Sequence, residues 1–158
     1  MAVTVNLSID TESIYHPSES DFHYWINAIM PFLSNTEKQH NRNEVNVAII
    51  DKKRSQHLNL QFRQQDKATN VLSFPNCPVP GEASHSLGDL AICSAVVNQE
   101  AHDQHKSEKS HWAHITVHGM LHLLDFDHQT DVEAKQMEQL EIEILSLLGY
   151  DNPYEENE

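Results

Sequence analysis

Residues 114–128 read HITVHGMLHLLDFDH and place His118, His122 and His128 in the spacing H-x3-H-x5-H. Side chains four residues apart lie on one face of an α-helix, so the first two histidines can reach a single ion. A turn after the helix brings the third histidine back to the same point. Three imidazoles with a fourth position open for water or substrate are typical of catalytic zinc, because structural zinc sites usually fill all four positions. We therefore expect one zinc ion on these three histidines.

The residues between the histidines predict that this helix lies in the core. They are largely apolar and include Val117, Met120, Leu121, Leu123 and Leu124. Buried imidazoles need partners, and a metal ion supplies one. Seven of the twelve histidines lie between positions 102 and 128, so a histidine-rich surface is the alternative. His114 lies one turn before His118, but side-chain directions drift by ~80° around the helix from position 114 to position 122, too far for all three histidines to converge easily on one ion. We therefore expect His114 to be structural or to support a ligand.

The histidine spacing resembles the H-E-x-x-H peptidase motif, but Gly119 stands where those enzymes carry the glutamate that activates water. Asp89 and Asp127 are the remaining candidates for a general base, and nothing in the sequence brings either to the histidines. Without an assigned base, the chemistry that remains is that of a metal ion acting as a Lewis acid. Such an ion can promote the hydrolysis of esters and phosphodiesters as well as peptides. The sequence predicts a metal-dependent hydrolase whose base is unassigned.

The rest of the chain predicts one α+β domain, because 158 residues suit a single core. Alternating or short apolar runs predict four strands, at 3–9, 45–50, 69–75 and 87–93, with 45–50 central. Capping residues and helical spacing predict about five helices, starting near Ser18, Ser55, Ser94, the histidine stretch and Thr130. The last of them carries an apolar stripe, Met137, Leu140, Ile144 and Leu147. We expect a mixed, mostly parallel four-stranded sheet, a hydrolase domain over 1–150 and a frayed acidic tail over 151–158.

The charge of the chain is strongly acidic and unevenly distributed. A net charge of -14 argues against a protein that coats nucleic acid or an anionic membrane by charge alone. Half of the ten Lys and Arg residues nevertheless fall within positions 52–67: Lys52, Lys53, Arg54, Arg63 and Lys67. This cluster is either a local patch for a polyanionic partner or a solvated group after a strand. Without a spanning apolar window or a signal-peptide pattern, we expect a soluble, cytoplasmic protein with no membrane partner.

Several segments together are similar to the YbeY family of bacterial endoribonucleases, which act as rRNA maturation factors. The run HWAHITVHGMLHLLDFDH at 111–128 resembles the family signature H-G-x-L-H-L-x-G-Y-D-H. Further stretches match in the same order, at 58–63, 66–75, 87–93 and 148–154. The resemblance covers most of the chain from about residue 45 onward, which makes it far more specific than the histidine spacing alone.

The resemblance implies both a site and a function. The family's zinc ligands fall on His118, His122 and His128, and its functionally important arginine falls on Arg63. It implies zinc-dependent cleavage of single-stranded RNA that matures the 3′ end of 16S rRNA and serves ribosome quality control. The implied partners are rRNA and the small ribosomal subunit, without DNA.

The residue chemistry agrees with that role for Arg63. A guanidinium binds phosphate through two parallel hydrogen bonds and stabilises charge in the transition state. The alternative is a surface ion pair with Asp66. The other basic residues are expected to follow the RNA backbone: Lys52, Lys53, Arg54 and Lys67.

Four positions depart from the family pattern: Asp125 replaces a glycine, Phe126 a tyrosine, Ala68 a proline and Asn70 an aspartate. Only the first two touch the metal site. Aspartate tolerates the left-handed conformation that a tight turn requires, so we expect the turn to His128 to form at a modest cost. The nucleophile is left open between water and the substrate's 2′-hydroxyl. Two rival functions also stay open: a non-catalytic ribosome-assembly factor with a structural zinc, and a metallopeptidase.

Overall fold

The computed structural model describes residues 2–11, 14–33, 42–75, 86–124 and 130–154. Its strands are β1 (Thr4–Asp10), β2 (Glu44–Ile50), β3 (Val71–Pro75) and β4 (Ser86–Cys93). Its α-helices are α1 (Glu19–Ile29), α2 (Lys52–Arg63), α3 (Ser94–Asp103), α4 (Glu108–Leu123) and α5 (Asp131–Leu147). A short 3-10 helix, η1 (Met30–Leu33), extends α1.

The four strands form one sheet in the order β1-β2-β4-β3. Strands β1, β2 and β4 are parallel, and β3 runs antiparallel to β4 at one edge. The strand predicted to be central, β2, does lie between two others. The predicted α+β domain with a mixed, mostly parallel sheet is therefore confirmed.

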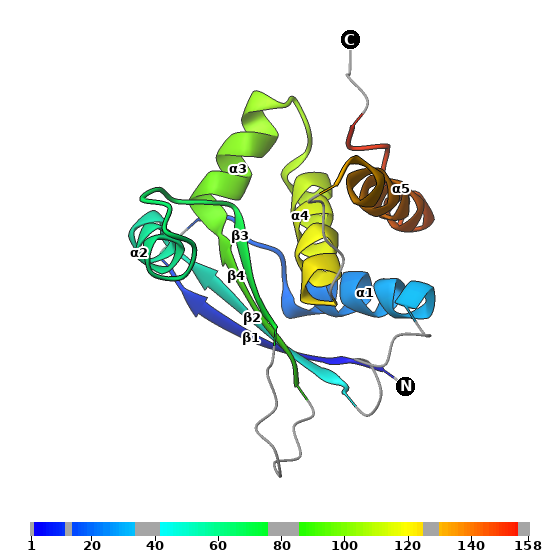
Figure 1. Ribbon diagram of the computed structural model, residues 1–158, viewed down its shortest axis with the longest axis horizontal. Helices are drawn as coiled ribbons and strands as arrows, with labels where there is room; N and C mark the ends of the chain where they lie inside the picture. The colour runs from blue at the N-terminus through cyan, green and yellow to red at the C-terminus, as the bar shows by residue number, and fades with distance from the viewer. Residues whose placement is uncertain (1, 12–13, 34–41, 76–85, 125–129, 155–158) are drawn as a thin grey trace.

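Helices cover the two faces of the sheet unequally. Figure 1 shows α1, α4 and α5 together on one side of the strands and α2 on the other. The larger buried cluster lies on the first side, where Phe22 packs edge-to-face against both Trp25 and Trp112. A smaller cluster lies on the α2 side and contains Ile50, Leu72, Ala91 and Cys93. The predicted core position of α4, the histidine helix, is confirmed.

Local capping signals set two of the helix starts. The Ser18 side chain accepts a hydrogen bond from the Asp21 backbone N–H at 3.2 Å, and the Asp21 carboxylate accepts from the Ser18 N–H at 3.1 Å. At the start of α5, the Thr130 hydroxyl accepts from the Glu133 N–H at 3.1 Å. Both predicted starts are confirmed, because such bonds satisfy N–H groups that a helix leaves unpaired.

The predicted start of α2 at Ser55 is wrong. The helix begins at Lys52, and Asp51 is its N-cap, since the Asp51 carboxylate accepts from the Arg54 N–H at 2.8 Å. Ser55 is buried instead, and its hydroxyl both donates to the Thr69 carbonyl and accepts from the Thr69 N–H, each at 3.0 Å. The basic triplet at 52–54 consequently forms the first turn of this helix, with all three side chains exposed.

The expected apolar stripe of α5 and the expected frayed tail after it also need correction. Leu147 is 66% exposed, whereas the ionisable Glu141 is fully buried on the core side of the helix. The chain after α5 returns to the body of the domain, because Lys106 Nζ donates to the Pro153 carbonyl at 2.7 Å and the Tyr154 hydroxyl donates to Glu141. Residues 150–154 therefore belong to the folded structure, while 155–158 lie outside the described residues.

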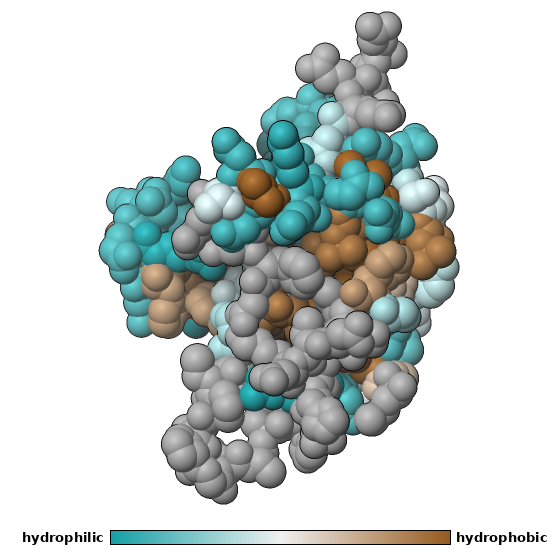
Figure 2. Space-filling view, turned by 45° about the vertical axis from the view of Figure 1, so that its right-hand side comes forward, coloured by the Kyte–Doolittle hydropathy of each residue, from teal (hydrophilic) through white to brown (hydrophobic). Residues whose placement is uncertain are grey.

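The described surface is mainly hydrophilic on the face in Figure 2, where hydrophobic residues form separate patches. Among the exposed large hydrophobic side chains are Phe62, Val132 and Leu147. None of the helices in the described part of the chain is long and apolar enough to cross a membrane.

Gly88 is required by the contact between β3 and β4, and we expect Gly88→Ala to lower the free energy of unfolding by ~3 kcal/mol or more. Its φ is +137°, and an added Cβ would lie 2.4 Å from the Phe74 carbonyl oxygen, a backbone atom that cannot withdraw without breaking the strand pair. Gly149→Ala is the matched control, since Gly149 has a φ of +91° but an added Cβ there would meet no atom within 4 Å. Urea unfolding should show a loss of only ~1 kcal/mol for the control. Equal losses in the two variants would contradict the steric account.

Candidate metal and phosphate site

His118 and His122 converge on the last turns of α4. Their Nε2 atoms are 3.1 Å apart and their ring centroids 4.6 Å apart. Both side chains are partly exposed, because they lie at the end of the helix where the core packing of α4 gives way to a cavity. The i, i+4 spacing thus produces the convergence that the sequence predicts. His128 lies in 125–129, outside the described residues.

The donor pair fits two neighbouring ligands of one zinc ion. Two nitrogens each ~2.1 Å from a tetrahedral zinc lie ~3.4 Å apart, close to the observed separation. Within the described ranges no three His, Cys, Asp or Glu side chains form a metal-binding group. A full ligand set therefore depends on His128, and zinc stays a prediction.

Glu141 of α5 lies directly behind His118. One carboxylate oxygen accepts a hydrogen bond from His118 Nδ1, and the other accepts from the Tyr154 hydroxyl. His114 Nε2 lies 3.5 Å from the second oxygen. Burial alone raises the pKa of Glu141, but the interactions with His114 and His118 outweigh it and bring that pKa to about 2. The carboxylate is therefore ionised and acts as an acceptor.

Sequence reasoning missed Glu141, although a signal was present. Positions 137, 141 and 144 recur at helical spacing, and Glu141 is the charged member of a stripe whose other members, Met137 and Ile144, are buried. A carboxylate on the core face of a helix requires a buried partner. The prediction that His114 is structural or supports a ligand agrees with its position beside this carboxylate.

Arg63 shares one cavity with the histidine pair. The cavity has a volume of about 200 Å³ and lies against the outer edge of β3, between the end of α2 and the end of α4. Its lining includes Asn59, Arg63, residues 69–73, His118 and His122. The alternative partner, Asp66, instead accepts a hydrogen bond from Gln56 at 2.8 Å. The Arg63 guanidinium can therefore bind a substrate phosphate in this cavity. The ester bond of that phosphate would then lie next to a metal ion held by the two histidines.

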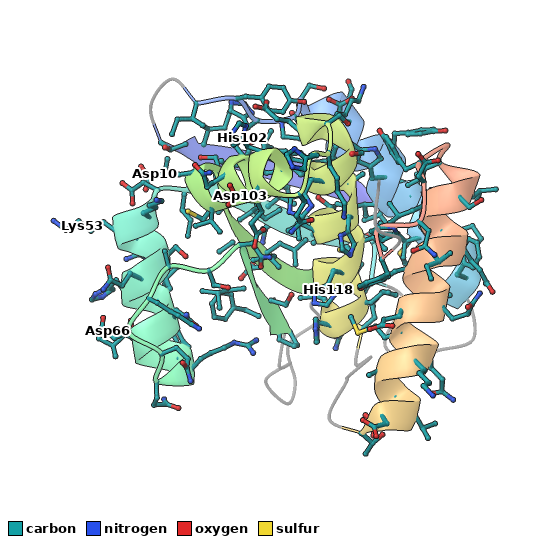
Figure 3. All side chains as sticks on the ribbon, turned by 90° about the horizontal axis from the view of Figure 1, so that it is seen from above. Asp10, Lys53, Asp66, His102, Asp103 and His118 are labelled. Carbon is teal, nitrogen blue, oxygen red and sulfur yellow. The ribbon has the colours of Figure 1, made fainter. Side chains whose placement is uncertain are left out.

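The other basic residues do not line this cavity. The triplet at 52–54 lies nine to eleven residues before Arg63, which corresponds to ~14–17 Å along a helix. Figure 3 shows Lys53 at the far end of α2, directed away from His118. Lys67 is exposed in the loop after α2, and its carbonyl accepts from Asn59 at 2.9 Å. Among these cations, therefore, Arg63 alone lines the cavity of the histidine pair.

Packing in the site excludes Asp89 as the general base and disfavours a peptidase-type glutamate at position 119. Asp89 is exposed on the sheet face away from α4, where it accepts from Asn46 at 2.7 Å, while the next residue, Leu90, faces Gly119. An added Cβ on Gly119 would lie 3.0 Å from Val71 and 3.2 Å from Leu90. Position 119 therefore packs on the sheet, and the glutamate of a peptidase would have to displace these side chains. Asp127 lies outside the described residues.

A family-wide sequence model described as Endoribonuclease YbeY matches residues 8–149. This chain belongs to the YbeY family. Proteins called Endoribonuclease YbeY from the Dugway 5J108-111 and RSA 493 / Nine Mile phase I strains of Coxiella burnetii are each 48% identical over 140 residues, which are 89% of this chain and 90% of theirs. The fold also matches a solution structure from Thermotoga maritima with a TM-score of 0.55 at 18% identity, covering 96% of this chain and 99% of that one.

The departures from the YbeY pattern fall on different parts of the site. Asn70 lines the cavity, accepts from the Val71 N–H at 2.6 Å and donates to Glu100 at 3.1 Å. An amide both accepts and donates here, whereas an aspartate carboxylate would meet the Glu100 carboxylate. Asp125 and Phe126 lie outside the described residues.

Proposed function

We propose that this YbeY-family protein is a zinc-dependent endoribonuclease that cleaves single-stranded RNA in the cytoplasm. We further propose that it acts in 16S rRNA 3′-end maturation and ribosome quality control, with the small ribosomal subunit as its partner. The observation that carries the proposal is the single cavity shared by Arg63, His118 and His122. The family name and its match over residues 8–149 support RNA as the substrate.

Each part of the cavity has a distinct role in this proposal. His118, His122 and His128 hold the zinc ion, which when bound supplies a Lewis acid for phosphodiester hydrolysis. Arg63 binds the scissile or an adjacent phosphate with its two parallel N–H donors and stabilises the negative charge that develops there. The nucleophile is water or the substrate's 2′-hydroxyl, and the chemistry of the RNA ends after cleavage distinguishes them. A 2′,3′-cyclic phosphate would exclude direct attack by water as the only step.

Four exposed basic side chains extend the phosphate contacts along α2 and the loop that follows it: Lys52, Lys53, Arg54 and Lys67. Cations in the first turn of a helix are unfavourable next to its positive dipole end, so the triplet is better explained by a binding role than by stability. An overall charge of -14 opposes RNA binding, and local cations must offset it. RNA affinity should therefore fall steeply with salt.

The residue that precedes the phosphate-binding arginine carries an exposed aromatic ring. Phe62 is 54% exposed, and its ring packs edge-to-face on Phe74 with centroids 5.2 Å apart, which holds it in one orientation. Aromatic rings on which bases stack are a regular feature of proteins that bind single strands. This pair supports a single-stranded substrate.

We expect Phe62→Ala to raise the KM for a single-stranded RNA by ~10-fold, because loss of one stacked base costs ~1–3 kcal/mol. Phe62→Tyr is the matched control and should keep the wild-type KM, since it keeps the ring. Steady-state cleavage of a labelled oligonucleotide measures both. If Phe62→Ala and Phe62→Tyr have the same KM, no nucleobase of the substrate stacks on the ring of Phe62.

The central experiment measures the metal content of purified protein and its cleavage of a defined single-stranded RNA before chelation, after chelation and after zinc is restored. We expect one zinc ion per chain and cleavage that follows zinc occupancy. Cleavage that persists in metal-free protein would overturn the zinc dependence. A duplex of the same sequence tests the preference for single strands.

A further inference from the structure

A buried cluster of three side chains stands behind His118, on the side away from the cavity. It consists of Glu141, Tyr154 and His114, from α5, the segment after α5, and α4. Glu141 is fully buried, whereas the His118 side chain keeps 28% of its surface exposed. The cluster therefore connects the histidine pair to the C-terminal segment of the chain.

The hydrogen bonds to Glu141 determine which nitrogen of His118 carries a proton. A carboxylate only accepts, so His118 must donate from Nδ1. In a neutral imidazole the Nε2 lone pair can then coordinate a metal, and Nε2 is the atom that faces His122 at 3.1 Å. Carboxylates that fix metal-ligating histidines in this way typically change metal affinity by 10- to 100-fold.

Tyr154 completes the partners of the carboxylate. Burial and the neighbouring Glu141 raise the pKa of Tyr154, so its hydroxyl remains a proton donor. Two further contacts hold the tyrosine in place: the Lys106 ammonium donates to the Pro153 carbonyl at 2.7 Å, and the Tyr154 N–H donates to Asn152 at 2.8 Å. The Tyr154 ring also packs edge-to-face on His114 at 5.5 Å.

We propose that Glu141 and Tyr154 are positioning residues for His118. Glu141 holds the His118 ring in the Nδ1-protonated tautomer with Nε2 toward His122, and Tyr154 holds the Glu141 carboxylate. The C-terminal segment thereby becomes a structural part of the metal site. This inference rests on the proposed function, since it assigns a role toward the zinc ion.

The test uses Glu141→Met, which removes both acceptor oxygens while keeping a side chain of similar length in the core. Zinc affinity, measured in full-length protein by competition with a chromophoric chelator, should fall by ~10- to 100-fold. The ¹⁵N chemical shifts of the His118 ring in metal-free protein should change from the Nδ1-protonated tautomer to a mixture. Glu141→Gln keeps one acceptor oxygen and should lie between wild type and Glu141→Met in both measurements. Glu143→Gln on the exposed face of the same helix is the control and should match wild type.

Tyr154→Phe provides a second variant that does not depend on tolerance of a core substitution, because Tyr154 is 43% exposed. Loss of one hydrogen bond to a charged group should lower zinc affinity by ~5- to 20-fold and leave the melting temperature within a few degrees. Tyr24→Phe makes the same chemical change at a 62% exposed position of α1 and should have no effect.

Wild-type zinc affinity and an unchanged His118 tautomer in Glu141→Met would overturn the positioning role. If Glu141→Met does not fold, wild-type affinity in Tyr154→Phe would overturn the role of the C-terminal segment. Failure of the wild-type protein to bind zinc would instead contradict the proposed function, while the tautomer comparison would still decide whether Glu141 orients His118.

Discussion

Arg63→Glu is expected to lower kcat/KM for a single-stranded RNA by at least ~1000-fold. Removal of a single donor that stabilises transition-state charge costs ~100- to 1000-fold, and the substituted carboxylate adds repulsion toward the phosphate. Zinc content and melting temperature should stay near wild type, because Arg63 is exposed at the end of α2. Cleavage of a labelled oligonucleotide, metal analysis and thermal unfolding measure the three quantities.

Arg54→Glu is the matched control, because it makes the same change of charge on the same helix at a position away from the cavity. It should weaken RNA binding only several-fold, and raised salt should abolish the difference. Full activity in Arg63→Glu would count against the proposed phosphate role. Equal losses in the two variants would show that the effect is general electrostatics and not a contact at the reacting phosphate.

His122→Ala has the second large expected effect, and it separates the enzyme from a non-catalytic assembly factor. If the histidines hold a catalytic ion, the variant should lose zinc and at least ~1000-fold in cleavage rate. Its free energy of unfolding in the metal-free state should change by less than ~1.5 kcal/mol, since the His122 side chain is only partly buried. Activity, zinc stoichiometry and urea unfolding, each with and without chelator, provide the comparison.

The structural-zinc alternative predicts the opposite pattern for His122→Ala. Thermal stability would fall, and any RNA cleavage would be unchanged and traceable to a contaminating nuclease. His102→Ala is the control for loss of an imidazole, because His102 is exposed on α3 and does not line the cavity. A metallopeptidase would degrade casein in a chelator-sensitive way, but the crowded position of Gly119 speaks against it.

Most helices and strands could be predicted from local patterns because the forces that define them act over a few residues. The alternation of apolar residues predicted β1, and the capping residues Ser18 and Thr130 set the starts of two helices through hydrogen bonds to neighbouring N–H groups. The same locality explains why the histidine pair could be found, since a separation of four residues implies one helical face. The start of α2 was wrongly predicted at Ser55, because packing places that residue in the interior with partners at Thr69, and Asp51 caps the helix instead.

Contacts between distant segments depended on the tertiary structure. Arg63 and His118 are 55 positions apart, and they share a cavity because α2 and α4 meet at the outer edge of β3. Glu141 looks like an interruption of an apolar stripe until α5 packs against α4 and places the carboxylate on His118. Hydrogen bonds within a turn follow from residue order, whereas the choice of which helix faces meet depends on burial summed over the whole core. The histidine helix with its candidate ligands is thus a property of the local sequence, and the site around it, with Arg63 in front and Glu141 and Tyr154 behind, exists only in the folded domain.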